Sequence, residues 1–128
     1  MKVIDSGHVY KLDSLDGTLS QHLIFVKREG PGFPGNVGHH PGTTLQEVMR
    51  AMVDRVEYLQ NQIACDENVA ILTYLRWSIW LLENRAARRH GRDLTHVPFR
   101  EIVDGVGKCM RCGHVGCLGD CHAKNTSH

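Results

Sequence analysis

The sequence is short of aromatic residues, of long apolar runs and of excess charge of either sign. Aromatic side chains make up 6% of the 128 residues, and the formal net charge is +1. No apolar run approaches the roughly 20 residues that a membrane-spanning helix needs, so the sequence predicts no such helix. A near-neutral chain also argues against a protein that coats long polyanions, because such proteins are usually strongly basic.

The N-terminal residues lack the apolar segment of a secretory signal, which leads us to expect a cytosolic protein. In a reducing cytosol the five cysteines are expected to bind metal or stay free rather than form disulfides. The composition, with 41% hydrophobic and 23% charged residues, is that of a globular protein. We therefore expect one folded domain, residues 1–104, followed by a short cysteine-rich tail, residues 105–128.

The first 28 residues predict a β-hairpin of two strands. Apolar and β-branched residues alternate loosely over 3–12, turn-forming residues occupy 13–18, and a β-rich run follows at 23–26. Such a hairpin is only marginally stable alone, so it is expected to pack on another part of the protein.

Residues 29–42 predict a loop, because their glycines and prolines exclude both a helix interior and a central strand. This loop is either a flexible linker or a binding loop. Phe33, Val37, His39 and His40 favour the binding loop, since long loops in compact domains are usually functional and linkers rarely contain aromatic and imidazole side chains.

Two long helices are expected next, over 43–63 and 67–90, because apolar residues recur every three or four positions. Their connection is so short that they must lie antiparallel, as a helical hairpin within 43–91. The predicted fold class is therefore α+β: an N-terminal β-hairpin and a Gly/Pro loop, followed by a long antiparallel α-helical hairpin.

The ends of these helices carry capping signals. Thr44 and Glu47 form a capping box at the start of the first helix. Asp66 is expected to be the N-cap of the second helix, and Gly91 is placed for a C-cap.

The second helix is apolar on two sides. The stripe expected to face the first helix consists of Leu72, Leu75, Ile79, Leu82 and Ala86. The stripe on nearly the opposite side consists of Tyr74, Trp77, Leu81, Asn84 and Arg88. Part of this second stripe can pack under the β-hairpin, but a helix with two apolar sides in so small a chain predicts self-association.

Four of the five cysteines lie in the last twenty residues. They are Cys109, Cys112, Cys117 and Cys121. Thiolates two residues apart on a glycine-containing turn can share one tetrahedral zinc ion, so the tail predicts a structural zinc in a knuckle-like segment. His122 is an alternative to Cys121 as the fourth ligand, and an unliganded tail is the alternative to zinc. We expect this segment to lie outside the helical core, so that truncation before residue 105 leaves the fold largely intact.

Arginines gather at the end of the second helix. They are Arg85, Arg88, Arg89 and Arg92. Cations near the C-terminus of a helix interact favourably with the helix dipole, and this interaction accounts for some of these arginines. An aromatic ring, an amide and an arginine on one stripe also form the usual set for a nucleotide, through stacking, base-edge hydrogen bonds and phosphate contacts. Because phosphate-loop, dinucleotide-binding and nucleophile-elbow motifs are missing, we expect a binding protein and not an enzyme.

Three segments carry a resemblance to a known family: residues 42–48 (GTTLQEV), 59–68 (LQNQIACDEN) and 80–85 (WLLENR). Together they resemble the helical hairpin of phage anti-CBASS and anti-Thoeris sponge proteins. The preceding hairpin and Gly/Pro loop point to the first Thoeris anti-defence family within that group. The resemblance covers about residues 1–92.

The resemblance implies a protein that sequesters cyclic nucleotide second messengers of bacterial immunity without cleaving them. Its ligands would be glycocyclic ADP-ribose and, at separate sites, cyclic trinucleotides, bound in the cytoplasm of the infected host. The chain would form a homodimer that assembles into a hexamer. The residues that the resemblance and the motifs together suggest for ligand binding are Arg28, Asn36, His39, Thr43, Arg50, Tyr74, Trp77, Asn84, Arg85, Arg88 and Arg92.

Within that set, Arg28 and Asn84 are expected in the pocket for glycocyclic ADP-ribose, with Tyr74 or Trp77 stacked on its adenine. Arg50 or an arginine of the cluster is expected at the second site. The alternative function is a small zinc-containing regulator that binds nucleic acid, and a third possibility is an assembly protein in which the aromatic stripe is only an interface. Nucleic-acid binding would fall steeply with salt, whereas binding of one small anion would respond far less.

Overall fold

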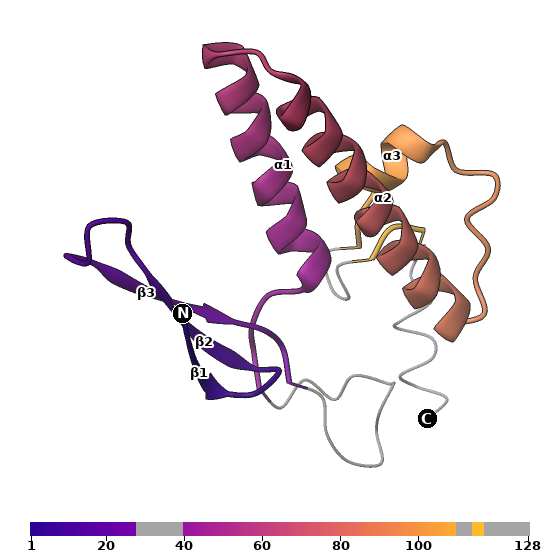
Figure 1. The fold of residues 1–128 in the computed structure, drawn as a ribbon. Coiled ribbons are helices and arrows are strands. Elements are labelled where there is room, and N and C mark those ends of the chain that lie inside the picture. Colours follow the sequence, from indigo (N-terminus) through magenta and orange to yellow (C-terminus); the bar gives the residue numbers. More distant parts are fainter. Residues whose placement is uncertain (28–39, 110–113, 117–128) are drawn as a thin grey trace. The chain divides into compact units, whose positions relative to one another are not determined.

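The structure is a computed structural model that describes residues 1–27, 40–109 and 114–116. Three strands and three helices follow one another in these residues, in the order β1, β2, β3, α1, α2, α3 (Figure 1). The prediction of a mixed α+β protein is therefore confirmed. The chain divides into two compact units, Met1–Thr44 and Leu45–His128, which we call the sheet unit and the helical unit.

The sheet unit contains an antiparallel sheet in the order β1-β2-β3. Its strands are β1 (Lys2–Asp5), β2 (Val9–Asp13) and β3 (Ser20–Ile24). The two-strand prediction missed β1, because the chain turns sharply at Gly7. This glycine has a φ of 80°, and its N–H donates to the Tyr10 hydroxyl at 2.8 Å.

The predicted turn between the last two strands is present. Asp16 organises it, because its Oδ1 accepts hydrogen bonds from the backbone N–H and the hydroxyl of Thr18 and from the hydroxyl of Ser14. Beyond β3, Phe25 pairs with Thr43 and Lys27 pairs with His40 in isolated bridges. In the described part of this unit, no hydrophobic side chain is fully buried.

The helical unit is built on α1 (Leu45–Gln62) and α2 (Asp66–Arg89), which lie side by side and run in opposite directions (Figure 1). A short helix, α3 (Phe99–Asp104), packs against α2. The ends of the two long helices fall within about two residues of the predicted ones. None of the helices in the described part of the chain is both long and apolar enough to cross a bilayer.

The two ends of α2 differ in how well they were predicted. Cys65, and not Asp66, is the N-cap, and Asp66 is the first helical residue, where its negative charge still favours the helix dipole. At the other end Gly91 has a φ of 68° and its N–H bonds to the carbonyl of Arg88, while the N–H of Arg92 bonds to that of Ala87. These two bonds form a Schellman motif that satisfies carbonyls at the helix end.

The core of the helical unit lies where the end of α2 meets α3 and the start of the tail. It consists of Ala87, Leu94, Ile102 and Val115, with Trp80 and Val97 packed against it. Val115 is only 3% exposed, so the prediction that the tail lies outside the core is wrong for this residue. Burial of apolar surface here packs Val115 against residues of α2 and α3. The stripe predicted to face α1 is buried at Leu72, Ile79 and Ala86 and half-buried at Leu75 and Leu82.

Candidate functional site

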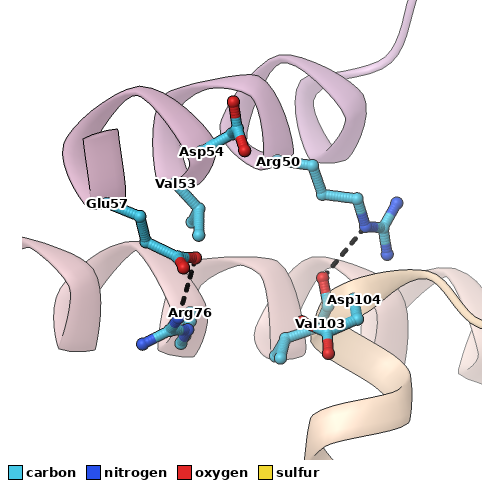
Figure 2. A pocket seen from close by; sticks show the side chains of 7 residues that line it. All are labelled: Arg50, Val53, Asp54, Glu57, Arg76, Val103 and Asp104. Atoms are coloured by element: carbon cyan, nitrogen blue, oxygen red, sulfur yellow. Dashed lines mark hydrogen bonds and ion pairs between the residues drawn. The ribbon is translucent and has the colours of Figure 1, made fainter. Parts of the chain in front are cut away.

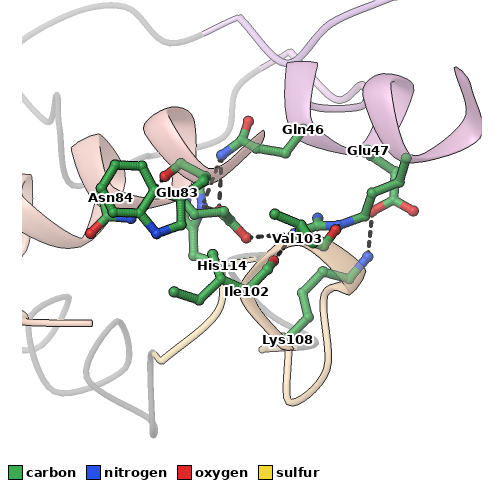
Figure 3. Close-up of polar contacts among 10 residues, drawn as sticks. Gln46, Glu47, Glu83, Asn84, Ile102, Val103, Lys108 and His114 are labelled. Atoms are coloured by element: carbon green, nitrogen blue, oxygen red, sulfur yellow. Dashed lines mark hydrogen bonds and ion pairs between the residues drawn. The ribbon is translucent and has the colours of Figure 1, made fainter. Parts of the chain in front are cut away.

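A buried polar cluster joins α1, α2, α3 and the tail (Figure 3). Its centre is Glu83 on α2, whose side chain is fully buried. Oε1 of Glu83 accepts a hydrogen bond from Nε2 of Gln46 at 3.1 Å and lies 3.4 Å from Nδ1 of His114. Oε2 accepts from Nη2 of Arg50 at 2.8 Å. Both oxygens of a carboxylate that has left water are thus paired, as a buried charge requires.

Arg50 also holds the end of α3. Its Nε donates to the carbonyl of Val103 at 3.0 Å, and its Nη2 donates to the carbonyl of Ile102 at 2.9 Å. The last carbonyls of a helix have no partner inside the helix. Arg50 gives the carbonyl of Val103 such a partner and adds a second one to the carbonyl of Ile102, which also accepts from the N–H of Gly105 at 3.3 Å. Outside the buried cluster, Lys108 forms an ion pair with Glu47 of α1. The side chain of Arg50 on α1 therefore links this helix to both α2 and α3.

Glu83 stays ionised although its side chain is buried. Burial by itself raises the pKa of this carboxyl, but hydrogen bonds from His114, Arg50 and Gln46 outweigh it and hold the pKa below the ordinary value. Glu83 is thus an anion that balances Arg50. Because its side chain has no access to solvent, it cannot meet a substrate, and it acts by positioning its neighbours.

A pocket of about 170 Å³ opens beside this cluster, between α1, α2 and α3 (Figure 2). Its polar lining is mixed. Arg76 pairs with Glu57 at 3.1 Å, and Arg50 is bonded to Glu83 and to the end of α3. Asp54 and Asp104 add two exposed carboxylates. With three acids against two arginines, the pocket does not favour a phosphate.

Sequence reasoning missed the polar cluster. The signal for Glu83 was its place four residues after Ile79, on the side of α2 that faces the core. Its partners Arg50 and His114 are 33 and 31 residues away, so no local pattern connects them to it. Gln46 carried no signal of its own, because a Gln on a helix is usually exposed. His114 lies among the cysteines of the tail, so its place in the sequence pointed to the predicted zinc segment and not to the core.

The predicted ligand residues fall into several places. Arg28, Asn36 and His39 lie outside the described residues. Thr43 belongs to the sheet unit, where its N–H bonds to the carbonyl of Ile24 at 2.8 Å. Arg50 is engaged in the polar cluster, where a phosphate would have to displace Glu83 and two helix carbonyls.

Four of the remaining predicted ligand residues lie on or near one side of α2, together with Leu81 of the predicted stripe. We call this side the outer face; its residues are Tyr74, Trp77, Leu81, Arg85 and Arg88. Tyr74 is 72% exposed, Trp77 50% and Leu81 59%. Both arginines are also exposed. The outer face therefore presents an apolar and aromatic part followed by a cationic part.

Two further predicted residues border this face. Asn84 is half-buried and donates from Nδ2 to the carbonyl of Trp80 at 2.8 Å, which leaves its oxygen as the group available to a ligand. Arg92 is half-buried, and within the described residues its Nε and Nη1 have no hydrogen-bond partner. Trp77 is supported from beside by Phe99, with ring centroids 5.0 Å apart, so α3 fixes its ring.

The predicted zinc ligands are only partly described. Cys109 is half-buried, and its N–H donates to the carbonyl of His114 at 3.1 Å. Cys112, Cys117, Cys121 and His122 lie outside the described residues. In the described part of the chain, no three side chains of the metal-binding types come together.

Comparison of the chain with protein-family models, with curated proteins and with solved structures gave no match.

Proposed function

We propose that the protein binds a cyclic nucleotide messenger on the outer face of α2 and sequesters it without cleavage. The observation that carries this proposal is the order of exposed side chains along that face. The aromatic rings of Tyr74 and Trp77 come first, and the guanidinium groups of Arg85 and Arg88 follow toward the helix end. Rings stack on a base and arginines pair with phosphate oxygens, so one face offers both contacts that a nucleotide needs.

The spacing suits a small ligand. Trp77 precedes Arg85 by eight residues, which is about 12 Å along a helix at about 1.5 Å per residue. The long arginine side chain shortens this gap, so a base on Trp77 and a phosphate on Arg85 can belong to one molecule. Asn84, between them in sequence, offers its amide oxygen to a base edge. The messengers proposed are glycocyclic ADP-ribose and cyclic trinucleotides in the cytoplasm of an infected bacterium.

A second copy of the chain is proposed to cover the ligand, because a single helix face leaves it open to water. Between Asn68 and Leu82 the only charged residue of α2 is Arg76, and this residue pairs with Glu57 of α1. The outer face is therefore uncharged over about four turns while its large side chains stay exposed. Such a face favours a homodimer, which would assemble further into a hexamer. The tail is proposed to hold one structural zinc through Cys109, Cys112, Cys117 and either Cys121 or His122.

The test is binding followed by recovery of the ligand. The full chain is titrated by calorimetry with glycocyclic ADP-ribose and with cyclic trinucleotides, then boiled, and the supernatant is chromatographed. The intact messenger is expected in the supernatant. Arg88→Ala should weaken binding by roughly 10- to 1000-fold, because a charge-assisted contact is worth a few kcal/mol. Arg100→Ala, an exposed arginine on α3, is the matched control and should change little.

Two outcomes would contradict the proposal. A hydrolysed product in the supernatant would make the protein an enzyme. Failure to bind any cyclic nucleotide, together with DNA or RNA binding that falls by orders of magnitude between low and moderate salt, would favour the nucleic-acid regulator.

A further inference from the structure

The two outer strands of the sheet differ in how their edges are protected. The edge of a sheet presents unpaired main-chain groups to other strands, and proteins usually block it with charged residues, proline or a bulge. On β1 the register with β2 shifts between Val3 and Asp5, and Lys2 and Asp5 add charge. On β3 all five residues pair with β2 in regular register, and none of them is an acid, a lysine, an arginine or a proline. The edge of β3 therefore lacks this protection.

The main-chain groups on the edge of β3 can be located from one hydrogen bond. The carbonyl of Ile24 accepts from the N–H of Thr43 at 2.8 Å, and Thr43 lies beyond the edge of β3 and not in β2. Every second residue of a strand directs its N–H and C=O to the same side, so those of His22 and Ser20 also face away from β2. In the described part of the sheet unit, no strand or isolated bridge covers them.

A row of basic side chains ends at the same edge. Lys2 of β1 lies opposite Lys11 of β2, and Lys11 lies opposite His22 of β3. Residues directly opposite one another share a face of the sheet, so these three side chains, all hydrogen-bond donors, stand side by side across it. The ion pairs among the described residues include neither Lys2 nor Lys11. Like charges opposite one another repel, so the row favours an anion beside it.

The acids of β1 and β2 are already engaged. Asp13 accepts a hydrogen bond from the N-terminal amine at 2.7 Å, which together with the charge of Lys11 holds the pKa of Asp13 below its ordinary value. Asp5 accepts from Nζ of Lys27 at 3.1 Å. An acidic partner therefore suits the row better than a second copy of the chain does, because two copies of β3 paired about His22 would bring their basic rows end to end.

We infer that the edge of β3 binds an extended acidic segment of another protein, which adds to the sheet as a fourth strand. The main chain of the segment pairs with Ser20 and His22, and the residue opposite His22 is an acid that lies in line with Lys11. The segment runs antiparallel to β3, since antiparallel pairing is slightly more stable. Because Thr43 closes the edge at Ile24, only a few residues are held, and the complex is weak. This surface belongs to the sheet unit and goes beyond nucleotide binding on the outer face of α2.

The probe is a blocked heptapeptide of threonines with one central glutamate, titrated into the isotope-labelled full chain and followed by NMR. The amide signals of Ser20 and His22 should shift, and their hydrogen exchange should slow as the peptide saturates, because both N–H groups become hydrogen-bonded. The same peptide with lysine in place of glutamate should bind at least ~5-fold more weakly, since attraction to the basic row becomes repulsion.

Methylated peptides separate strand addition from simple charge attraction. A methyl group on the glutamate nitrogen removes the N–H that faces His22, so affinity should fall at least ~5-fold. A methyl group on the nitrogen of the next residue, whose N–H points away from β3, is the matched control and should change affinity less than ~2-fold.

Lys11→Gln tests the basic row in the protein itself. The preference for the glutamate peptide over the lysine peptide should fall ~2-fold or more. Arg100→Gln is the matched control, because it removes an exposed cation of the helical unit and should leave the preference unchanged. The peptide comparisons on the unmutated chain decide the question even where Lys11→Gln fails to fold.

Each part of the inference can be overturned separately. Equal binding of the glutamate and lysine peptides would exclude an acidic occupant, and equal binding of the two methylated peptides would exclude strand addition. The same shifts and protection of Ser20 and His22 with inorganic phosphate alone would assign the row to free anions. Signals of β3 that change when the chain alone is diluted would assign the edge to a second copy. No shift in β3 at millimolar peptide would remove the site altogether, and none of these results bears on the outer face of α2.

Discussion

Glu83 accepts a hydrogen bond from Arg50 at 2.8 Å, and this contact ties α2 to α1 inside the helical unit. The pair is more than a bridge between two helices, because the same guanidinium holds two carbonyls at the end of α3. A buried ion pair does not by itself prove high stability, since both charges have lost their hydration. Removing one partner, however, leaves the other charge uncompensated.

Glu83→Ala is therefore expected to destabilise the helical unit by about 3–5 kcal/mol. Chemical denaturation followed by helix content gives the measurement. Glu57→Ala is the matched control, because Glu57 also pairs with an arginine across α1 and α2 but is 51% exposed. That change should cost less than about 1 kcal/mol. Equal losses in the two variants would mean that the burial of Glu83 has no energetic consequence.

Gly105→Ala is expected to cost more than Gly107→Ala. Both glycines have a positive φ, 77° and 72°, which costs an alanine about 1–2 kcal/mol. A Cβ on Gly105 would also lie 2.9 Å from Nε of Arg50, whereas nothing lies within 4 Å of the same atom on Gly107. The guanidinium would have to shift and weaken its bonds to α3, adding about 1 kcal/mol or more.

The difference between these two variants, measured by thermal or chemical unfolding, isolates the part played by Arg50. If both alanines cost the same, Arg50 moves aside freely, and the hydrogen bonds that it makes to α3 contribute little to stability.

Much of the helical unit could be predicted from the sequence. The apolar period gave the two long helices, and Gly91 marked the end of α2, because both signals act over a few neighbouring residues. The third strand could not be predicted, since the turn at Gly7 is so short that β1 and β2 read as one run. The tail was misjudged because Val115 finds its apolar partners, such as Ala87 and Leu94, far away in sequence.

The candidate site likewise has one part that could be predicted from the sequence and one part that could not. The outer face could be predicted from helical spacing, which places Tyr74, Trp77 and Leu81 on one side of α2. All three side chains are exposed in the structure. The polar cluster depends on which residues of three helices and the tail meet in space. Arg50 shows the difference most clearly. The sequence suggested that it contacts a phosphate, whereas its side chain is hydrogen-bonded to Glu83 and to α3.

Asp5 is expected to show a depressed pKa that depends on Lys27. A hydrogen bond from Lys27 at 3.1 Å and a contact with His8 at 3.2 Å hold the pKa of this carboxyl below its ordinary value of 3.8. Because the folded pKa is the lower one, the contribution of Asp5 to stability is present above about pH 3.8 and is lost as the pH falls through the folded value.

Carboxyl NMR titration measures this directly. Lys27→Ala should raise the pKa of Asp5, while the pKa of Asp16, which is lowered by hydrogen bonds from Thr18, should stay where it is. An unchanged Asp5 in the variant would show that Lys27 does not pair with it in solution.

The outer face of α2 should be the surface through which the chain self-associates. Changing Tyr74 and Leu81 together to Asp would place two charges in a contact that excludes water, and the cost of burying them should exceed what the dimer gains from its apolar area. The wild type is expected to sediment as an oligomer at micromolar concentration, and the double variant as a monomer with unchanged helix content. Tyr58→Asp is the control, since Tyr58 is another exposed tyrosine, placed on α1 beneath Arg55. A monomeric wild type, or dissociation by Tyr58→Asp as well, would remove the outer face from this role.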